Sequence, residues 1–266
     1  MDRLVRDGVA LAYEETGRGE PPLLLVHCWT CDHSFFAPQA QHFRHQHRVI
    51  NVDLRGHGAS DKPCQDYTVA GFADDLAWLC AQLAVIKPVV IGHSMGGNIA
   101  LELAARHPDL PAAIVMVDSA ILLPPELLEG VKPFAAALHG DGFREAQREF
   151  VGSYPFFLPS DDPARKARIL EVMSSAPQHV MANALDEHIL RWDAAAAAAA
   201  CRVPALYIAA TAFLSDIARL RALCPQLVVG QTVGAGHFNN QEVPEQVNAM
   251  IERFLATTLA VVPRGI

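Results

Sequence analysis

Apolar stretches of strand length alternate along most of the chain with segments whose apolar residues recur at helical spacing. Polar residues do not interrupt the strand-length stretches regularly, which is typical of strands buried on both faces of a parallel sheet. These stretches lie at residues 23–27, 49–53, 89–92, 113–117, 205–209 and 227–233. Helical spacing predicts helices over 72–83, 98–106 and 243–255. The alternation predicts an α/β fold with a mainly parallel sheet and helices on both faces.

Two regions depart from this alternation. The first twenty residues predict a short hairpin with Thr16-Gly17-Arg18-Gly19 as loop. Residues 121–195 contain a Pro pair, short amphipathic segments and several Phe residues, but no obvious strand. We interpret 121–195 as a helical cap, inserted into a core domain of 1–120 and 196–266, over the sheet edge where open α/β sheets bind ligands. The alanine run 194–200 predicts a helix that leads back into the sheet.

Composition and charge narrow the choice of function. A chain of 266 residues with 51% hydrophobic and 19% charged residues fits one α/β domain. The formal net charge is −8 and there is no basic run, so nucleic acid is not an expected partner. No stretch approaches the roughly 18 uncharged apolar residues of a membrane span, and the charged segment Met1–Asp7 is unlike a signal peptide. We therefore expect a cytoplasmic protein with a small-molecule substrate, and a homodimer is left open.

The six cysteines are expected to be reduced thiols in that compartment. Cys28 and Cys31 have the C-x-x-C spacing of redox sites. They follow a predicted strand, however, and no second pair completes a zinc site. We interpret them as a coincidence in a loop, with redox or metal chemistry as the alternative.

The segment Val89–Asn98 carries the strongest chemical signal. It contains the pattern G-x-S-x-G around Ser94, with an apolar strand directly before it and a helical pattern directly after it. A strand that turns sharply into a helix strains the residue at the turn, and Gly92 and Gly96 leave space for that bend. The hydroxyl of Ser94 would then project above the sheet near a helix N-terminus, which favours developing negative charge. These features predict Ser94 as a nucleophile rather than a helix cap.

This segment resembles the nucleophile elbow of the α/β-hydrolase superfamily, and three further segments are similar to its signatures in the expected order. They are Val26–Trp29, Asp53–Asp61 and Gly234–Phe238. The resemblance implies an α/β-hydrolase fold with a mostly parallel eight-stranded sheet and a helical cap. It also implies oxyanion donors at the backbone N–H groups of Met95 and Trp29. The sequence departs from the family pattern at Cys28, where the family usually has Gly.

A serine nucleophile needs a base to accept its proton. Among twelve histidines, His237 is the predicted base, because it follows the last predicted strand in a loop of small residues. His93 is next to Ser94 and would point away at a sharp turn. The other histidines that we considered fall in polar segments or in loops that the family pattern makes structural.

The carboxylate that would orient this base is less obvious. Most family members carry it after the seventh strand, but Phe213 occupies that place here. Asp216 follows three residues later and is interpreted more simply as a first-turn acid of a helix. Asp118 ends the sixth predicted strand, 24 residues after Ser94, where a minority of the superfamily places its acid. We predict Asp118 as the triad acid and keep Asp216 as the alternative.

These residues predict hydrolysis of a small, hydrophobic or aromatic carboxylic ester or lactone through an acyl-enzyme on Ser94. One alternative is a cofactor-free, ring-cleaving dioxygenase of quinolone type, to which Trp29 and Cys31-Asp32-His33 are similar. Those enzymes usually have His where this chain has Met95. A binding protein without catalysis is the other alternative. No metal cluster or nucleotide loop is evident, so no cofactor or metal is expected. The predicted substrate-binding residues are Phe35, Phe156, Phe157, Trp192 and Phe238.

Overall fold

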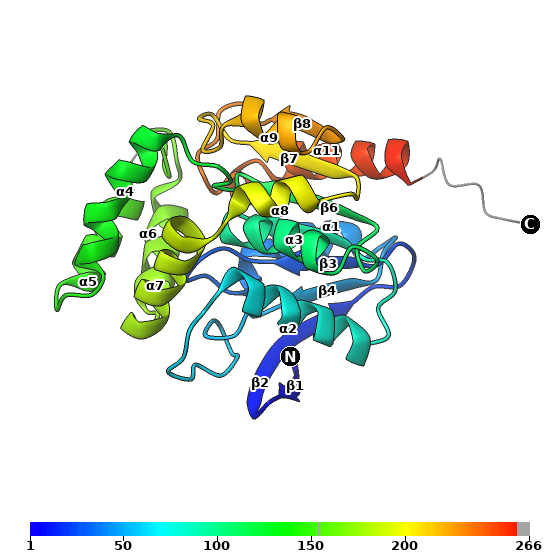
Figure 1. The fold of residues 1–266 in the computed structure, drawn as a ribbon, viewed down its shortest axis with the longest axis horizontal. Coiled ribbons are helices and arrows are strands. Elements are labelled where there is room, and N and C mark those ends of the chain that lie inside the picture. Colours follow the sequence, from blue (N-terminus) through cyan, green and yellow to red (C-terminus); the bar gives the residue numbers. More distant parts are fainter. Residues whose placement is uncertain (154, 260–266) are drawn as a thin grey trace, which may run out of the picture.

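The computed structural model describes residues 1–153 and 155–259 and is built around one eight-stranded sheet (Figure 1). The strand order is β1-β2-β4-β3-β5-β6-β7-β8. The first two strands are antiparallel to their neighbours, and the other six run parallel. The strands are β1 Asp2–Arg6, β2 Val9–Thr16, β3 Leu23–Val26, β4 Val49–Val52, β5 Val89–His93, β6 Ala113–Val117, β7 Ala205–Ala209 and β8 Leu227–Gln231.

The N-terminal hairpin forms, but it turns earlier than the loop that we expected to carry it. Asp7 and Gly8 make the turn with φ values of 51° and 79°. Asp-Gly suits such a turn because both central residues need positive φ. Thr16 is the last residue of β2, and 17–19 belong to the connection from β2 to β3.

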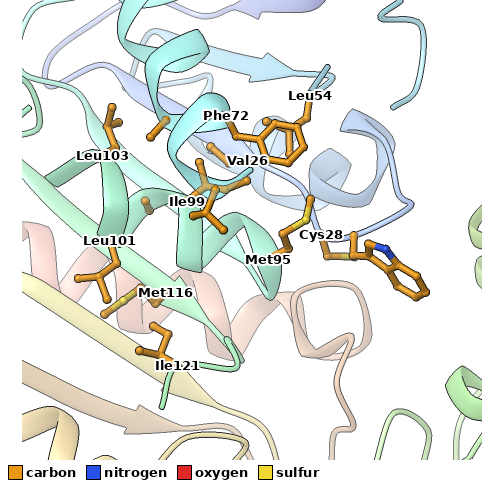
Figure 2. Close-up of a cluster of buried hydrophobic side chains, with 14 of the residues drawn as sticks. Val26, Cys28, Leu54, Phe72, Met95, Ile99, Leu101, Leu103, Met116 and Ile121 are labelled. Atoms are coloured by element: carbon orange, nitrogen blue, oxygen red, sulfur yellow. The ribbon is translucent and has the colours of Figure 1, made fainter. Parts of the chain in front are cut away.

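Helices cover both faces of the sheet. One face carries α2 (Val69–Gln82), α3 (Met95–Arg106) and α8 (Ala194–Ala200), which Figure 1 shows side by side along the sheet. The other carries α1 (Ala37–Phe43) and α11 (Pro244–Thr258). Side chains of a strand point alternately to the two faces. Leu24 therefore packs in the cluster under α2 and α3, part of which Figure 2 shows, whereas Leu23 packs against α1 and α11.

The helices between β6 and α8 lie together beyond one end of the sheet (Figure 1). They are α4 Pro125–Ala137, α5 Phe143–Val151, α6 Pro163–Ser174, α7 Gln178–Leu185 and the π-helical turn η2 Asp186–Arg191. The indole N–H of Trp29, in the loop after β3, donates to the carbonyl oxygen of Met181 on α7 at 2.9 Å. Because that loop leaves the carboxyl end of a parallel strand, these helices cover the carboxyl edge. Residues 154 and 260–266, which fall in the expected cap and core segments, lie outside the described residues.

The remaining short elements connect the layers. They are the 3-10 turn η1 His33–Phe36, α9 Ile217–Leu223 and α10 Asn239–Glu242. None of the helices in the described ranges has both the length and the apolar character that crossing a bilayer requires.

Candidate active site

Ser94 lies at a strained turn between β5 and α3. Its φ and ψ are 53° and −118°, a region that residues with a side chain rarely adopt. The flanking glycines make this turn possible. A Cβ on Gly92 would lie 2.0 Å from the Gly96 carbonyl oxygen, and one on Gly96 would lie 2.0 Å from the Val26 carbonyl oxygen. The backbone packing thus requires glycine at both positions and leaves the Ser94 side chain at the sheet edge.

His237 and Asp118 form a buried pair. His237 Nδ1 lies 2.7 Å from Asp118 Oδ2, and the two side chains are 5% and 2% exposed. The other carboxylate oxygen accepts from the backbone N–H of Ala210, at the end of β7, at 2.9 Å. Each oxygen therefore has a donor, and the pair is compatible with an Nδ1–H tautomer that leaves Nε2 free to accept a proton.

The two aspartates considered for this pair lie in different settings. Asp118 follows β6 directly with φ 42°, a second strained position at the carboxyl edge. Asp216 accepts from the backbone N–H of Arg219 at 3.0 Å and so caps α9. Phe213, which occupies the position of the usual family acid, lines the cavity described below. The geometry favours Asp118 as the carboxylate partner of the histidine.

The backbone of the His237 loop is held from the core and from the cap. His93 Nε2 donates to the His237 carbonyl oxygen at 2.8 Å, and the His237 N–H donates to the Phe156 carbonyl oxygen at 3.0 Å. His93 was expected only to point away from the site, and nothing local in the sequence indicated this contact across 144 residues. These two hydrogen bonds therefore fix the backbone of the histidine loop at two points.

A carboxyl group behind the loop adds a third attachment. Glu242 Oε2 accepts from the N–H of Gly236 at 2.9 Å. Burial, together with a hydrogen bond to Asp161, raises the pKa of Glu242 to about 7. A Cβ on Gly236 would lie 2.5 Å from the Phe156 carbonyl oxygen, so the cap backbone closely approaches this loop.

Two backbone N–H groups beside Ser94 are free to donate. In the part of the chain that the structure describes, no acceptor pairs with the N–H of Met95 or of Trp29. The Met95 side chain is buried in the core cluster, and Figure 2 shows it with Cys28 in that cluster. Trp29 precedes Thr30, whose φ is 56°. Within the described residues both N–H groups therefore lack an acceptor, as the predicted oxyanion donors would.

Cys28 and Cys31 are buried free thiols whose sulfur atoms lie 2.7 Å apart. Cys28, at the position where the family usually has Gly, also lines the cavity next to Ser94. Among the described residues, no group of three or more His, Cys, Asp or Glu side chains is arranged to hold a metal ion.

A cavity of about 510 Å³ lies between the sheet edge and the cap, and Ser94 and His237 both line it. Most of its wall is apolar. The core contributes Cys28, Trp29, Ala120, Ala212, Phe213 and Leu214; the cap contributes Leu123, Glu126, Leu127, Gly130, Val131, Phe134, Phe150, Pro155, Phe156, Met173, Leu185, His188 and Ile189. A cavity of this size suits a small organic molecule.

The alpha/beta hydrolase fold model matches residues 21–242 of this sequence. The chain belongs to the α/β-hydrolase family. It is 28% identical to the 2-(acetamidomethylene)succinate hydrolase of Mesorhizobium japonicum over 93% of this chain and 92% of that protein. Two solved structures are also similar. A thermophilic esterase from Thermogutta terrifontis has a TM-score of 0.83 at 28% identity, over 97% of this chain and 99% of that one. The enol-lactonase from Burkholderia xenovorans has a TM-score of 0.84 at 25% identity, over 96% and 100%.

The predicted substrate-binding residues of this α/β-hydrolase divide into two groups. Phe156 lines the cavity. Phe35, Phe157 and Phe238 are buried and pack on one another away from it, with ring centroids 6.1 and 5.3 Å from Phe238. Trp192 donates through Nε1 to Glu102 Oε2 on α3 at 2.9 Å. These four side chains are absent from the cavity lining and take part in core packing and in the attachment to α3, so their contact with substrate stays a prediction.

The cap helices supply cavity residues that sequence reasoning missed. Phe134 and Phe150 stack with ring centroids 3.9 Å apart, and Phe134 also meets Trp29 edge-on at 6.0 Å. His188 on η2 is a further cavity residue that was not predicted. Aromatic residues in a predicted amphipathic cap were a signal, but the sequence alone did not show which helix faces turn inward.

Proposed function

We propose that this α/β-hydrolase cleaves a carboxylic ester or lactone through an acyl-enzyme on Ser94. The observation that carries the proposal is the 2.7 Å contact of His237 with Asp118 beside the same cavity that Ser94 enters. A histidine oriented by a carboxylate next to a serine at a nucleophile elbow is the arrangement that acyl transfer uses.

The residues have complementary roles in this reaction. Ser94 Oγ attacks the substrate carbonyl carbon as its proton passes to His237 Nε2. Asp118 accepts from Nδ1–H, which orients the ring and stabilises the imidazolium. The N–H groups of Met95 and Trp29 donate to the oxyanion, and each such donor is worth about 3 kcal/mol in the transition state.

The tetrahedral intermediate then collapses. The bond to the leaving oxygen breaks, and the imidazolium returns its proton to that oxygen, which leaves as an alcohol or as the opened end of a lactone. A water molecule then attacks the acyl carbonyl carbon as its proton passes to His237 Nε2. The bond to Ser94 Oγ breaks, the imidazolium returns the proton to Oγ, and the acid is released. Acylation and deacylation each balance in protons and electron pairs, so the proposed reaction needs no cofactor.

The cavity wall supports an uncharged, hydrophobic or aromatic substrate. The residues that line it in the described structure include no Lys or Arg, and Glu126 is acidic. The name of the Mesorhizobium relative refers to a succinate, which carries two carboxylates. This cavity offers such a substrate no cationic partner, so an ester or lactone like those named for the esterase and enol-lactonase neighbours fits better.

The test combines a substrate panel with trapping of the nucleophile. We expect hydrolysis of p-nitrophenyl esters or lactones with apolar groups, unchanged when oxygen is removed, and stoichiometric labelling of Ser94 by a fluorophosphonate. Ser94→Ala should lose both the labelling and roughly 10⁴-fold or more of kcat. Full activity in Ser94→Ala, or turnover that requires oxygen, would contradict the proposal.

A further inference from the structure

His188 is a polar residue of the cavity wall whose neighbours there, Leu185 and Ile189, are apolar. The residue is 6% exposed and lines the cavity from the cap. Its Nδ1 lies 2.5 Å from the carbonyl oxygen of Ala184, one turn earlier in the helix. A carbonyl oxygen only accepts, so Nδ1 carries the hydrogen and a neutral ring has an unprotonated Nε2. No group in the described chain donates to this Nε2.

The ring is held neutral as well as oriented. Burial lowers the pKa of His188 to about 4, and the hydrogen bond to Ala184 offsets only part of this effect. Near neutral pH the Nε2 atom is therefore a lone-pair acceptor with no proton of its own. Because the side chain lines the cavity and its Nε2 has no donor in the described chain, a donor group on a bound molecule would add a hydrogen bond that the folded chain leaves unmade.

The backbone around His188 adds an independent indication. Residues Asp186–Arg191 form a π-helical turn, a rare geometry that frequently occurs at functional sites. The His188 carbonyl oxygen lies 3.5 Å from Asn98 Nδ2, in the first turn of the helix that Ser94 precedes. This contact ties the turn to the nucleophile side of the cavity.

We propose that His188 is a specificity-determining residue whose Nε2 accepts a hydrogen bond from a hydroxyl or N–H group of the substrate. This inference rests on the proposed hydrolysis at Ser94 and narrows its substrate class. The substrate is a hydrophobic or aromatic ester or lactone that carries a donor, such as a phenolic hydroxyl, apart from the reacting carbonyl. The other polar side chains of the wall have different positions: Ser94 and His237 belong to the reaction, Cys28 adjoins Ser94, and Glu126 is exposed at the cap surface.

Matched substrates test the proposal in the full-length enzyme. The acyl side is tested with p-nitrophenyl dihydrocinnamate and its p-hydroxy analogue, and the alcohol side with phenethyl butyrate and its p-hydroxy analogue. In at least one pair, kcat/KM should favour the hydroxylated ester by roughly tenfold. His188→Leu should reduce that ratio to near one, and His188→Gln, which keeps an acceptor, should restore part of it.

Two control variants test whether the preference for the hydroxylated ester depends on His188 itself. His179→Leu makes the same change on α7 at a histidine outside the cavity lining, and it should keep the wild-type ratio. Glu126→Leu removes the carboxylate of the cap wall, which could also accept a hydrogen bond, and should keep the ratio. A ratio that is near one in the wild type, or that disappears with Glu126→Leu and survives in His188→Leu, overturns the proposal.

A binding measurement separates this proposal from the reaction itself. Ring-nitrogen NMR of labelled histidine in Ser94→Ala protein should show a neutral His188 with an unprotonated Nε2, assigned by its loss in His188→Gln. Adding p-cresol should shift that resonance, whereas toluene should not. A protonated Nε2, or equal responses to the two ligands, would show that the inference fails even if hydrolysis at Ser94 is established.

Discussion

The cavity has two walls that are built in opposite ways. The sheet-edge wall presents Ser94 and His237 from loops at strand ends, with Asp118 hydrogen-bonded to His237 and with strained backbone at Ser94 and Asp118. The cap wall is made by helical side chains, mostly apolar, with His188 as its buried polar exception. In the proposed reaction, the sheet edge would hold the reacting groups at fixed positions, and the cap would select the molecule that fits against them. Changes to the two walls should therefore affect different kinetic constants.

The largest effect is expected at the sheet-edge wall. Asp118→Asn replaces the carboxylate that accepts from His237, which favours the wrong tautomer, so kcat should fall by about 10³–10⁴. Asp216→Asn, which alters only the cap of α9, should keep kcat within a factor of about two. Steady-state kinetics of both variants on one ester make the comparison, and a loss confined to Asp216→Asn would contradict our assignment.

A smaller effect is expected at the cap wall. Phe134→Leu removes the ring that stacks on Phe150 and meets Trp29. Aromatic pairs contribute about 0.5–1.5 kcal/mol each, so kcat/KM for an aromatic ester should fall about three- to tenfold, mainly through KM. The loss should be greater for an aromatic acyl group than for an acetyl group. A fall in kcat as large as that expected for Asp118→Asn would contradict the expectation that the two walls affect different kinetic constants.

The pH dependence of stability is sensitive to buried histidines behind both walls. Burial lowers the pKa of His188 to about 4 and that of His57, where His27 adds to the effect, to about 3. Between these values and the usual 6.5, the unfolded chain binds more protons than the folded one. The free energy of unfolding should therefore fall as pH decreases below about 6.5, by up to about 1.4 kcal/mol per pH unit for each histidine.

Urea unfolding between neutral pH and pH 5 measures this slope. The contribution of His188 should persist down to about pH 4, and that of His57 to about pH 3. His188→Gln should make the dependence shallower by up to one such contribution. An unchanged slope in this variant would show that His188 is not held neutral by burial.

The smallest effect is expected at Trp192, which was predicted to contact substrate but is bonded to Glu102. Trp192→Phe removes that hydrogen bond and should lower the free energy of unfolding by about 1–2 kcal/mol. Because the side chain lies outside the cavity lining, kcat/KM should stay within about twofold of the wild type. A large change in KM would instead support the original prediction.

Local sequence patterns were sufficient to predict most of the fold and the contact between His237 and Asp118 near Ser94. The strands appear as short apolar stretches. The turn at Ser94 could be predicted because Gly92, Ser94 and Gly96 lie close together in the sequence. His237 and Asp118 were predicted from their places after strands in the family order. Their 2.7 Å contact joins residues 119 apart, but parallel strand ends bring such residues to one edge.

The lining of the cavity depended on packing that no local pattern encodes. Phe156 and Phe157 are neighbours, yet Phe156 faces the cavity and Phe157 packs on Phe238. His188 had no recognisable motif, and its free Nε2 depends on the contact with Ala184 within the folded cap. The sequence by itself determined the α/β-hydrolase core and the residues expected to react, because strand periodicity and tight turns are local. Only the tertiary structure decided which cap side chains meet a substrate, because helix rotation is set by contacts between distant segments.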